Sequence, residues 1–349
     1  MAHEVESMMY AGETPWHKLG TPVSGSITCA QAIVKSGLDW EVESVPLYLD
    51  KGNGECDEKL SIEARAHTRN VGGKRTVLGV VGPKTVILQN PEAFAWFDPF
   101  VRSGEATLET AGSLREGRVV WILARITGDP LVIVPRANDT VERYILLSNA
   151  HDGTRAVSVG FSPIRVVCAN TLAMADAAAT SSLLKVRHTK GMHDTLEAVR
   201  EVMNVAKSAF EATAEQYRYL ASRDIDAKGL DAYVRRVFDE SPPAEVTAET
   251  VRWEKYGMSR GKTKESRSEA YNRERREAIV RLFERGRGNA APGVRGTYWA
   301  AYNGITEYLG NDRPRGGTLE SRTESLSMGG KGGAQGISQR ALSLALAAA

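Results

Sequence analysis

The sequence is poor in cysteine, with only three among 349 residues. Cys29, Cys56 and Cys168 lie far apart, which argues against a disulfide framework and against a cysteine zinc site. A reducing compartment is the natural expectation for such a chain. No apolar run approaches the roughly 18 residues that a membrane-spanning helix needs. The acidic first residues lack the apolar segment of a secretory signal, so we expect a cytoplasmic protein without a membrane partner.

The chain also lacks a strong overall charge, since 45 lysines and arginines face 43 acidic residues for a net charge of +2. The molecule is therefore no polycation, and any binding to nucleic acid must come from local basic faces. An apolar content of 42% and a charged content of 25% are typical of a globular protein. The length allows one large domain or two ordinary ones.

A phosphate-binding loop is absent in its usual form. Gly257-Met-Ser-Arg-Gly-Lys-Thr263 is one residue shorter than the spacing of that motif, and no apolar strand leads into it. We therefore expect no nucleotide hydrolysis by this loop.

Metal ligands and nucleophiles are scattered. The pairs His151-Asp152 and His193-Asp194 contain ligand types for divalent ions, but His151-Asp-Gly153 also has the composition of a tight turn. Cys168, with Asn170 and His188, contains the residue types of a cysteine nucleophile, yet its apolar neighbours are typical of a buried, inert thiol. We expect no metal, no cofactor and no catalytic residue, and an enzyme is the less favoured interpretation.

Hydrophobic periodicity predicts an α+β fold with a mixed or antiparallel sheet, packed helices and a helical C-terminal region. Three regions follow: an N-terminal segment with a first helix (1–39), a sheet core (40–190) and the helical region (191–349). Strands are predicted over 40–49, 61–69, 76–81, 85–88, 108–114, 118–126, 131–135, 142–147, 155–161 and 183–188. Helices are predicted over 28–37, 90–101, from Pro163 onward, 193–223, 227–238, 247–285, 297–308 and 337–349, while 1–25 and 310–336 are expected to be irregular.

Cations interrupt apolar, strand-like segments between Arg155 and Thr189. A buried segment does not hold charge without a partner or a ligand. The residues concerned are Arg155, Arg165, Lys185, Arg187, His188 and the following Lys190. A second set on the early strands comprises Arg65, Arg69, Lys74 and Arg75. If these strands share a sheet, the cations line one groove that suits a sugar-phosphate backbone, with Tyr144 nearby. Alternatively, the arginines pair with Glu63, Glu105, Glu109 and Asp152.

Two other segments allow a nucleic-acid role and a plainer one. Trp16 and His17, in a frame of proline and glycine, are candidates for stacking a base while Lys18 meets a phosphate, or Trp16 closes an edge of the core. The basic run over 252–287 alternates with glutamates, which is typical of a solvated, ion-paired helix face.

Several blocks of the sequence resemble a known family. They are Thr14-Pro-Trp-His-Lys-Leu-Gly20, Leu78-Gly-Val-Val-Gly82, Gln89-Asn-Pro-Glu-Ala-Phe94, Glu109-Thr-Ala-Gly-Ser-Leu114, His151-Asp-Gly153, Pro163-Ile-Arg-Val-Val-Cys-Ala-Asn-Thr-Leu172, Arg187-His-Thr189 and Ala301-Tyr-Asn-Gly-Ile-Thr-Glu-Tyr308. In this order they resemble the phage/plasmid-related family of uncharacterised proteins, which implies a mobile-element origin and a bacterial host cell but assigns no catalytic residue. The order of a meander, a helix and further strands is more loosely similar to the Rad52-like single-strand annealing proteins.

The sequence therefore leads to the hypothesis of a single-stranded DNA-binding and annealing protein, acting in recombination or DNA protection without nucleotide hydrolysis, as a homo-oligomeric ring or filament. One alternative is a phage factor that modulates a host protein, which would expose an apolar patch around Tyr298, Trp299 and Tyr302. Another is a metal-dependent hydrolase of nucleic acid or nucleotides that uses His151, Asp152 and His188.

Overall fold

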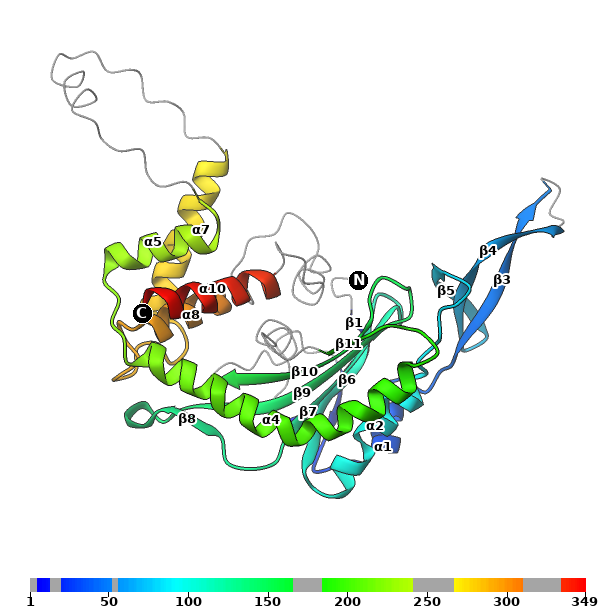
Figure 1. Ribbon diagram of the computed structural model, residues 1–349, viewed down its shortest axis with the longest axis horizontal. Helices are drawn as coiled ribbons and strands as arrows, with labels where there is room; N and C mark the ends of the chain where they lie inside the picture. Colours follow the sequence, from blue (N-terminus) through cyan, green and yellow to red (C-terminus); the bar gives the residue numbers. More distant parts are fainter. Residues whose placement is uncertain (1–4, 13–19, 52–55, 166–183, 241–266, 310–333) are drawn as a thin grey trace, which may run out of the picture.

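The protein is built on two β-sheets with helices packed against the larger one (Figure 1). The computed structural model describes residues 5–12, 20–51, 56–165, 184–240, 267–309 and 334–349. The strands are β1 (Val5–Ala11), β2 (Thr21–Val23), β3 (Val42–Asp50), β4 (Cys56–Val71), β5 (Lys74–Val81), β6 (Ala106–Leu114), β7 (Val119–Ile126), β8 (Leu131–Val134), β9 (Asp139–Ala150), β10 (Val157–Arg165) and β11 (Leu184–Val186). The helices are α1 (Cys29–Lys35), α2 (Asn90–Arg102), α4 (Met192–Ala221), α5 (Ala227–Val237), α7 (Arg267–Arg285), α8 (Tyr298–Glu307) and α10 (Ala334–Ala348), with a short 3-10 turn η1 (Pro135–Ala137). The expected α+β class is confirmed.

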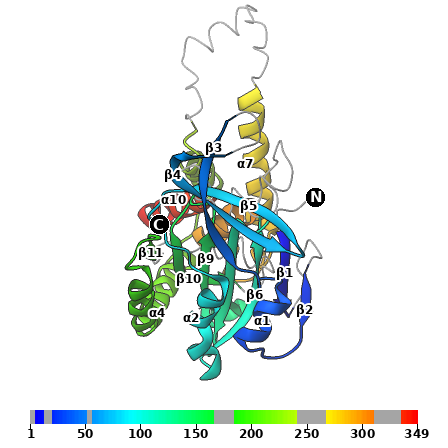
Figure 2. The ribbon, with the colours of Figure 1, turned by 90° about the vertical axis from the view of Figure 1, so that its right-hand side faces the viewer.

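The larger sheet has the strand order β11-β10-β9-β7-β6-β1-β2, with β8 beside β9, and the smaller one has the order β3-β4-β5. All neighbours are antiparallel except β1 and β2. The condition for a single groove, that the early meander and the later strands share a sheet, is not met, because they belong to different sheets. The smaller sheet instead projects from one end of the larger one, as two perpendicular views show (Figures 1 and 2).

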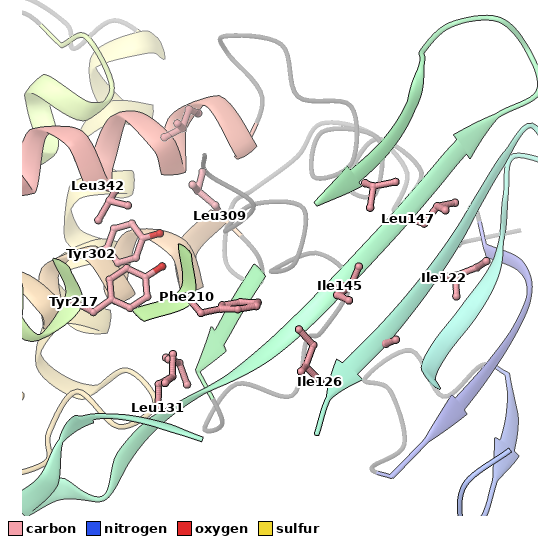
Figure 3. Packing of buried hydrophobic residues seen from close by; sticks show 14 of the residues in the cluster. Ile122, Ile126, Leu131, Ile145, Leu147, Phe210, Tyr217, Tyr302, Leu309 and Leu342 are labelled. Atoms are coloured by element: carbon pink, nitrogen blue, oxygen red, sulfur yellow. The ribbon is translucent and has the colours of Figure 1, made fainter. Parts of the chain in front are cut away.

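The core lies on the face of the larger sheet that carries the helices. Ile122 and Ile145 of the central strands belong to the same buried cluster as Phe210 and Tyr217 of α4 (Figure 3). Tyr302 of α8 closes the same cluster, so the helical C-terminal region shares one core with the sheet. A second buried cluster covers the opposite face; it comprises Met8, Tyr10, Leu114, Val119, Trp121, Leu123, Tyr144, Leu146 and Ala150. Because both faces are buried, the first six residues of β7, Val119 to Ala124, are all apolar rather than alternating with polar ones.

Local signals account for the beginnings of the helices. The Thr28 side chain accepts a hydrogen bond from the Gln31 amide at 3.2 Å and caps α1, as expected. Helix α2 begins at Asn90, as predicted, and is capped by Gln89, whose backbone amide donates to Glu92 at 2.8 Å. Because Gln89 is the cap, the Asn90 side chain can contact distant carbonyls, which are described below. Helices α4, α5, α8 and α10 lie within one to three residues of their predicted bounds.

Three local predictions are wrong. The first residues were expected to be irregular, but β1 pairs with β6 and brings Met9 opposite Ala111. The stretch 85–88, expected as a strand, has no regular structure. The helix predicted from Pro163 onward does not begin there: residues 163–165 are the last part of β10, where Pro163 lies opposite Arg143 of β9, and the remainder of that prediction lies outside the described residues. Beyond Val159 this strand has no neighbour on its β11 side among the described residues. A proline without an N–H donor fits such an edge.

Within the described part of the chain, no helix combines the length and the apolar character that crossing a membrane requires.

Candidate nucleic-acid interface

The two sheets meet where the turn between β9 and β10 lies against β5. A side-chain carbon at Gly79 of β5 would come within 2.6 Å of the Asp152 Cα atom, so only glycine allows this approach. On the turn, a carbon at Gly153 would lie 2.8 Å from Val81 of β5. We call this contact region, with the segments that adjoin it, the sheet junction.

The turn at the junction is stabilised by its own side chains. Asp152 Oδ1 accepts hydrogen bonds from the Thr154 amide at 2.9 Å and the Thr154 hydroxyl at 2.6 Å. Gly153 follows with a φ of 76°, which favours glycine. The Asp152 carboxylate therefore has a structural role in a tight turn, as one interpretation of His151-Asp-Gly153 predicted.

Three histidines from separate segments come together beneath this turn. His67 of β4 contacts the His151 carbonyl oxygen through Nδ1 at 2.8 Å, and His188, after β11, contacts the Val86 carbonyl oxygen through Nδ1 at 2.9 Å. A carbonyl oxygen only accepts, so each Nδ1 must carry the proton. In their neutral form both rings then have a bare Nε2, and neither Nε2 has a hydrogen-bond partner among the described residues.

The third ring is held in the opposite tautomer. Asn90 donates its amide nitrogen to the carbonyls of Leu38 at 3.1 Å and Trp40 at 3.3 Å, which leaves its side-chain oxygen to accept. His151 Nε2 lies 3.0 Å from that oxygen and therefore donates. This chain of contacts connects the end of β9 to the first turn of α2 and to the segment before β3.

Burial keeps the three histidines uncharged at neutral pH. Burial lowers the pKa of His151 to about 3, and the nearby His188, His67 and Arg69 act in the same direction. The pKa values of His67 and His188 are also lowered, mainly by burial. Among the described residues, no group of three or more histidine, cysteine or acidic side chains is arranged to hold a metal ion. The cluster therefore contributes polar contacts rather than positive charge to the junction.

Exposed cations surround the junction. Arg118 precedes β7, and its carbonyl accepts the His151 amide at 2.8 Å. Lys84 lies two residues before Val86, whose amide donates to the His188 carbonyl at 3.0 Å. Arg187 and Lys190 flank that same histidine. These four side chains, Lys84, Arg118, Arg187 and Lys190, are exposed and form no ion pair with any described acid, and we call them the junction cations.

Several predicted cations are held by the protein itself. Arg69 is buried: its guanidinium forms an ion pair with Glu6 and lies 4.7 Å above the Trp40 ring. Arg65 donates to the Ser44 hydroxyl at 2.7 Å and to the Ser44 carbonyl at 2.6 Å. We therefore leave both out of the proposed interface. The pairing of buried arginines with acids was the right alternative for Arg69, but the partner is Glu6 of β1, which lies in a segment expected to be irregular.

The other predicted site residues are divided between exposed, half-buried and undescribed positions. Lys74 is exposed, and Arg75 pairs with Glu43 at 3.0 Å at the end of the β4–β5 hairpin. Arg155 is half-buried in the turn after β9, whereas Tyr144 is buried and burial raises its pKa. Arg165 ends β10 opposite Val141, and Lys185 of β11 lies opposite Ser158, but their side chains are outside the described residues. So are Trp16, His17, Lys18, Cys168, Asn170 and the loop 257–263.

Sequence reasoning missed Lys84 and Arg118. Each occupies a short loop beside a strand end, and nothing in its neighbours along the chain indicates that these loops meet. The one indication in the sequence that these segments meet is the presence of glycine at positions 79 and 153. Glycine has no side chain and therefore allows two backbones to approach closely.

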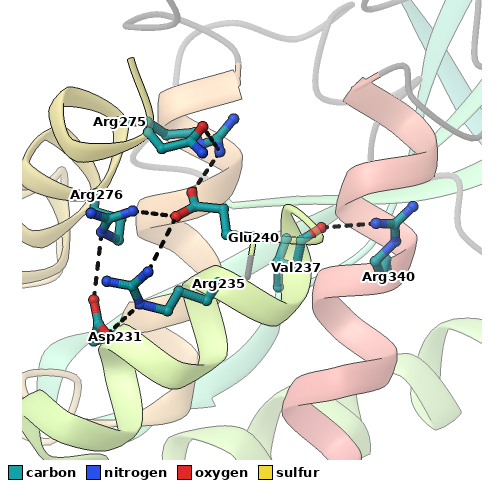
Figure 4. Close-up of polar contacts among 8 residues, drawn as sticks. Asp231, Arg235, Val237, Glu240, Arg275, Arg276 and Arg340 are labelled. Carbon is teal, nitrogen blue, oxygen red and sulfur yellow. Dashed lines mark hydrogen bonds and ion pairs between the residues drawn. The ribbon is translucent and has the colours of Figure 1, made fainter. Parts of the chain in front are cut away.

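Two arginines of the basic helix α7, Arg275 and Arg276, are paired with acids of the protein itself (Figure 4). Glu240, almost completely buried, pairs with Arg275 at 2.5 Å, with Arg235 at 3.8 Å and with Arg276. Farther along the helix surface, Arg273 pairs with Glu277 at 3.2 Å. The exposed pair of Arg273 with Glu277 fits the solvated, ion-paired face that the alternating charges predicted, whereas Arg275 and Arg276 use a buried acid from outside the run.

The fold and this junction define an α+β protein in which two sheets meet at a polar, cation-rimmed contact. A family model described as "Domain of unknown function (DUF932)" matches residues 77–331, and the chain belongs to this family. The matched range contains the four junction cations, His151 and His188, whereas β3 and β4 precede it. No curated protein matches the chain, and no solved structure matches it.

Proposed function

We propose that the protein binds single-stranded DNA through the junction cations and acts in recombination or DNA protection on a mobile element without hydrolysing nucleotides. The main support is that Lys84, Arg118, Arg187 and Lys190 gather at one end of the larger sheet without acidic partners among the described residues. In a chain of nearly balanced charge, such a local excess favours a polyanionic ligand.

The secondary structure that carries the cations supports a single strand over a duplex. All four lie in loops or at strand ends. None of the four lies on a helix that could enter a major groove. Cations in loops contact phosphates without reading bases, which suits a binder with little sequence preference.

Neither alternative gains support from the described residues. The patch predicted for a protein-interaction module is part of the core, with Trp299 and Tyr302 almost completely buried and Tyr298 half-buried. The hydrolase alternative relied on His151 and Asp152. In the structure the Asp152 carboxylate accepts a hydrogen bond from the Thr154 amide within its own turn, and His151 donates to Asn90, so both side chains already have structural partners.

The test is the binding of a fluorescent oligonucleotide, single- and double-stranded, at two salt concentrations without added metal. We expect Arg118→Ala and Arg187→Ala to weaken binding of the single strand by about 1 kcal/mol each, roughly fivefold, and to lower the salt slope by about 0.7 per lost phosphate contact. Arg136→Ala is the matched control, because Arg136 lies exposed near the opposite end of β9 and forms no ion pair with an acid in the described ranges. Unchanged affinity and salt slope in folded junction variants would reject the proposal.

A further inference from the structure

We propose that the free edge of strand β5 pairs with the same strand of a second copy of the chain, forming a two-fold symmetric dimer. This inference goes beyond the DNA-binding proposal and does not depend on it. It rests on the position of β5 in the smaller sheet, on two exposed valines and on the stretch Thr76–Val81, which contains neither a charge nor a proline.

The strand β5 has an unsatisfied edge. The smaller sheet has the order β3-β4-β5, so among the described residues β5 pairs with β4 on one side only. Its other side presents a row of backbone donors and acceptors, which a further strand satisfies best.

A bulge gives this edge an apolar outer face. The pairing between β4 and β5 shifts register between His67 and Thr68, where Leu78 is the extra residue of β5. The Leu78 side chain enters the core. The valines on either side of the Leu78-Gly79 pair point outward, with Val77 53% exposed and Val80 59% exposed. Two large aliphatic side chains with this exposure, on one strand edge, favour a protein partner over solvent.

The two edges of the smaller sheet differ in protection. Strand β3 carries Pro46 and Glu43, both of which discourage pairing. The stretch Thr76–Val81 of β5 has neither a charge nor a proline. Pairing of β5 with β3 of another copy would build a ring or filament, but it would use the unfavourable β3 edge. Pairing of β5 with β5 avoids that edge.

The sequence of β5 is self-complementary in antiparallel pairing. If Val77 of one copy lies opposite Val80 of the other, the two-fold axis passes beside Leu78 and Gly79, and both valine pairs form on the outer face. In this register Arg75 lies opposite Gly82 and Lys74 opposite Pro83, so like charges do not meet. An isologous contact of this kind closes as a dimer.

The first test is the molar mass in solution, measured by light scattering over a range of protein concentrations. We expect the natural chain to form a dimer and the double variant V77K/V80K to be a monomer, since lysine on an edge strand blocks pairing. The control is Val34→Lys on α1, where the valine is 61% exposed but lies outside both sheets, and which should remain a dimer. A monomeric natural chain, or a dimer that survives V77K/V80K, would overturn the proposal.

A second measurement keeps the test valid if the lysine variants fail to fold. A V77C chain and a V80C chain are mixed and oxidised, and cross-linked peptides are identified by mass spectrometry to separate them from the three natural cysteines. We expect a disulfide between positions 77 and 80 in the mixture and much less in either chain alone. Equal cross-linking in V77C alone would exclude this register.

Discussion

Trp299 Nε1 donates a hydrogen bond to Asp139 Oδ2 at 2.7 Å across 160 residues of sequence. Asp139 is the first residue of β9 and Trp299 lies in the first turn of α8, and both are buried. This contact fastens the helical C-terminal region to the central sheet. Together with the shared apolar core it makes the two regions one structural unit in the described part of the chain.

Removing this donor should destabilise the whole protein. Trp299→Phe leaves a buried carboxylate oxygen without its indole donor and opens a small cavity, which should lower the free energy of unfolding by about 2–4 kcal/mol. Urea denaturation followed by far-UV circular dichroism measures the effect. Tyr298→Phe is the control, because its hydroxyl makes only a long, exposed contact of 3.4 Å with the Ala348 carbonyl. A loss confined to one of two separate transitions would show that the regions unfold independently.

The histidines of the sheet junction predict acid sensitivity. Because the pKa of His151 is about 3 in the folded state and near 6.5 when unfolded, the unfolded state binds more protons throughout that window. The free energy of unfolding should therefore fall as the pH drops below about 6.5, by up to about 1.4 kcal/mol per pH unit for this residue.

The variant His151→Gln tests that assignment, since glutamine keeps a side-chain donor but does not titrate. Its unfolding free energy, measured in urea between pH 7.5 and pH 5, should depend less steeply on pH than that of the natural chain. His193→Gln provides the comparison, because His193 is exposed on α4. If H151Q and the natural chain kept the same slope, the acid sensitivity would have another origin.

Glu240 should matter far more to stability than its exposed neighbour Asp239. Glu240→Ala leaves Arg275, Arg276 and Arg235 without their common buried partner, which should cost about 3–5 kcal/mol. Asp239→Ala removes an exposed pair with Arg340 and should cost less than about 1 kcal/mol. Thermal or urea unfolding of the two variants measures the difference. Equal, small losses would mean that the arginines find water or other partners when Glu240 is absent.

Cys29 should be inert toward thiol reagents in the folded protein. Burial, together with the adjacent Asp98 carboxylate, raises the pKa of its thiol to about 12, so the reactive thiolate is rare near neutral pH. Maleimide labelling followed by peptide mapping should find Cys29 unmodified at pH 7.5 and modified in strong urea. Rapid labelling without denaturant would indicate that α1 and α2 separate readily.

Much of the local structure follows from short-range chemistry in the sequence. The long α4 contains no glycine or proline and keeps one apolar face, Thr28 and Gln31 form a capping box, and Arg115-Glu-Gly117 makes the hairpin turn between β6 and β7. These features depend on residues within a few positions of one another, and so periodicity and turn composition predict them.

Only the tertiary structure decided which charges are available and which strands are neighbours. Glu6 neutralises Arg69 from 63 residues away, and β5 meets the Asp152 turn because Gly79 has no side chain. Lys84, Arg118 and Arg187 come to the same end of the larger sheet only when three loops converge. The sequence alone thus determined the α+β class and most helices, since these depend on local propensity and pattern. The burial of charge and the pairing of sheets depend on long-range contacts, whose energies no local pattern encodes.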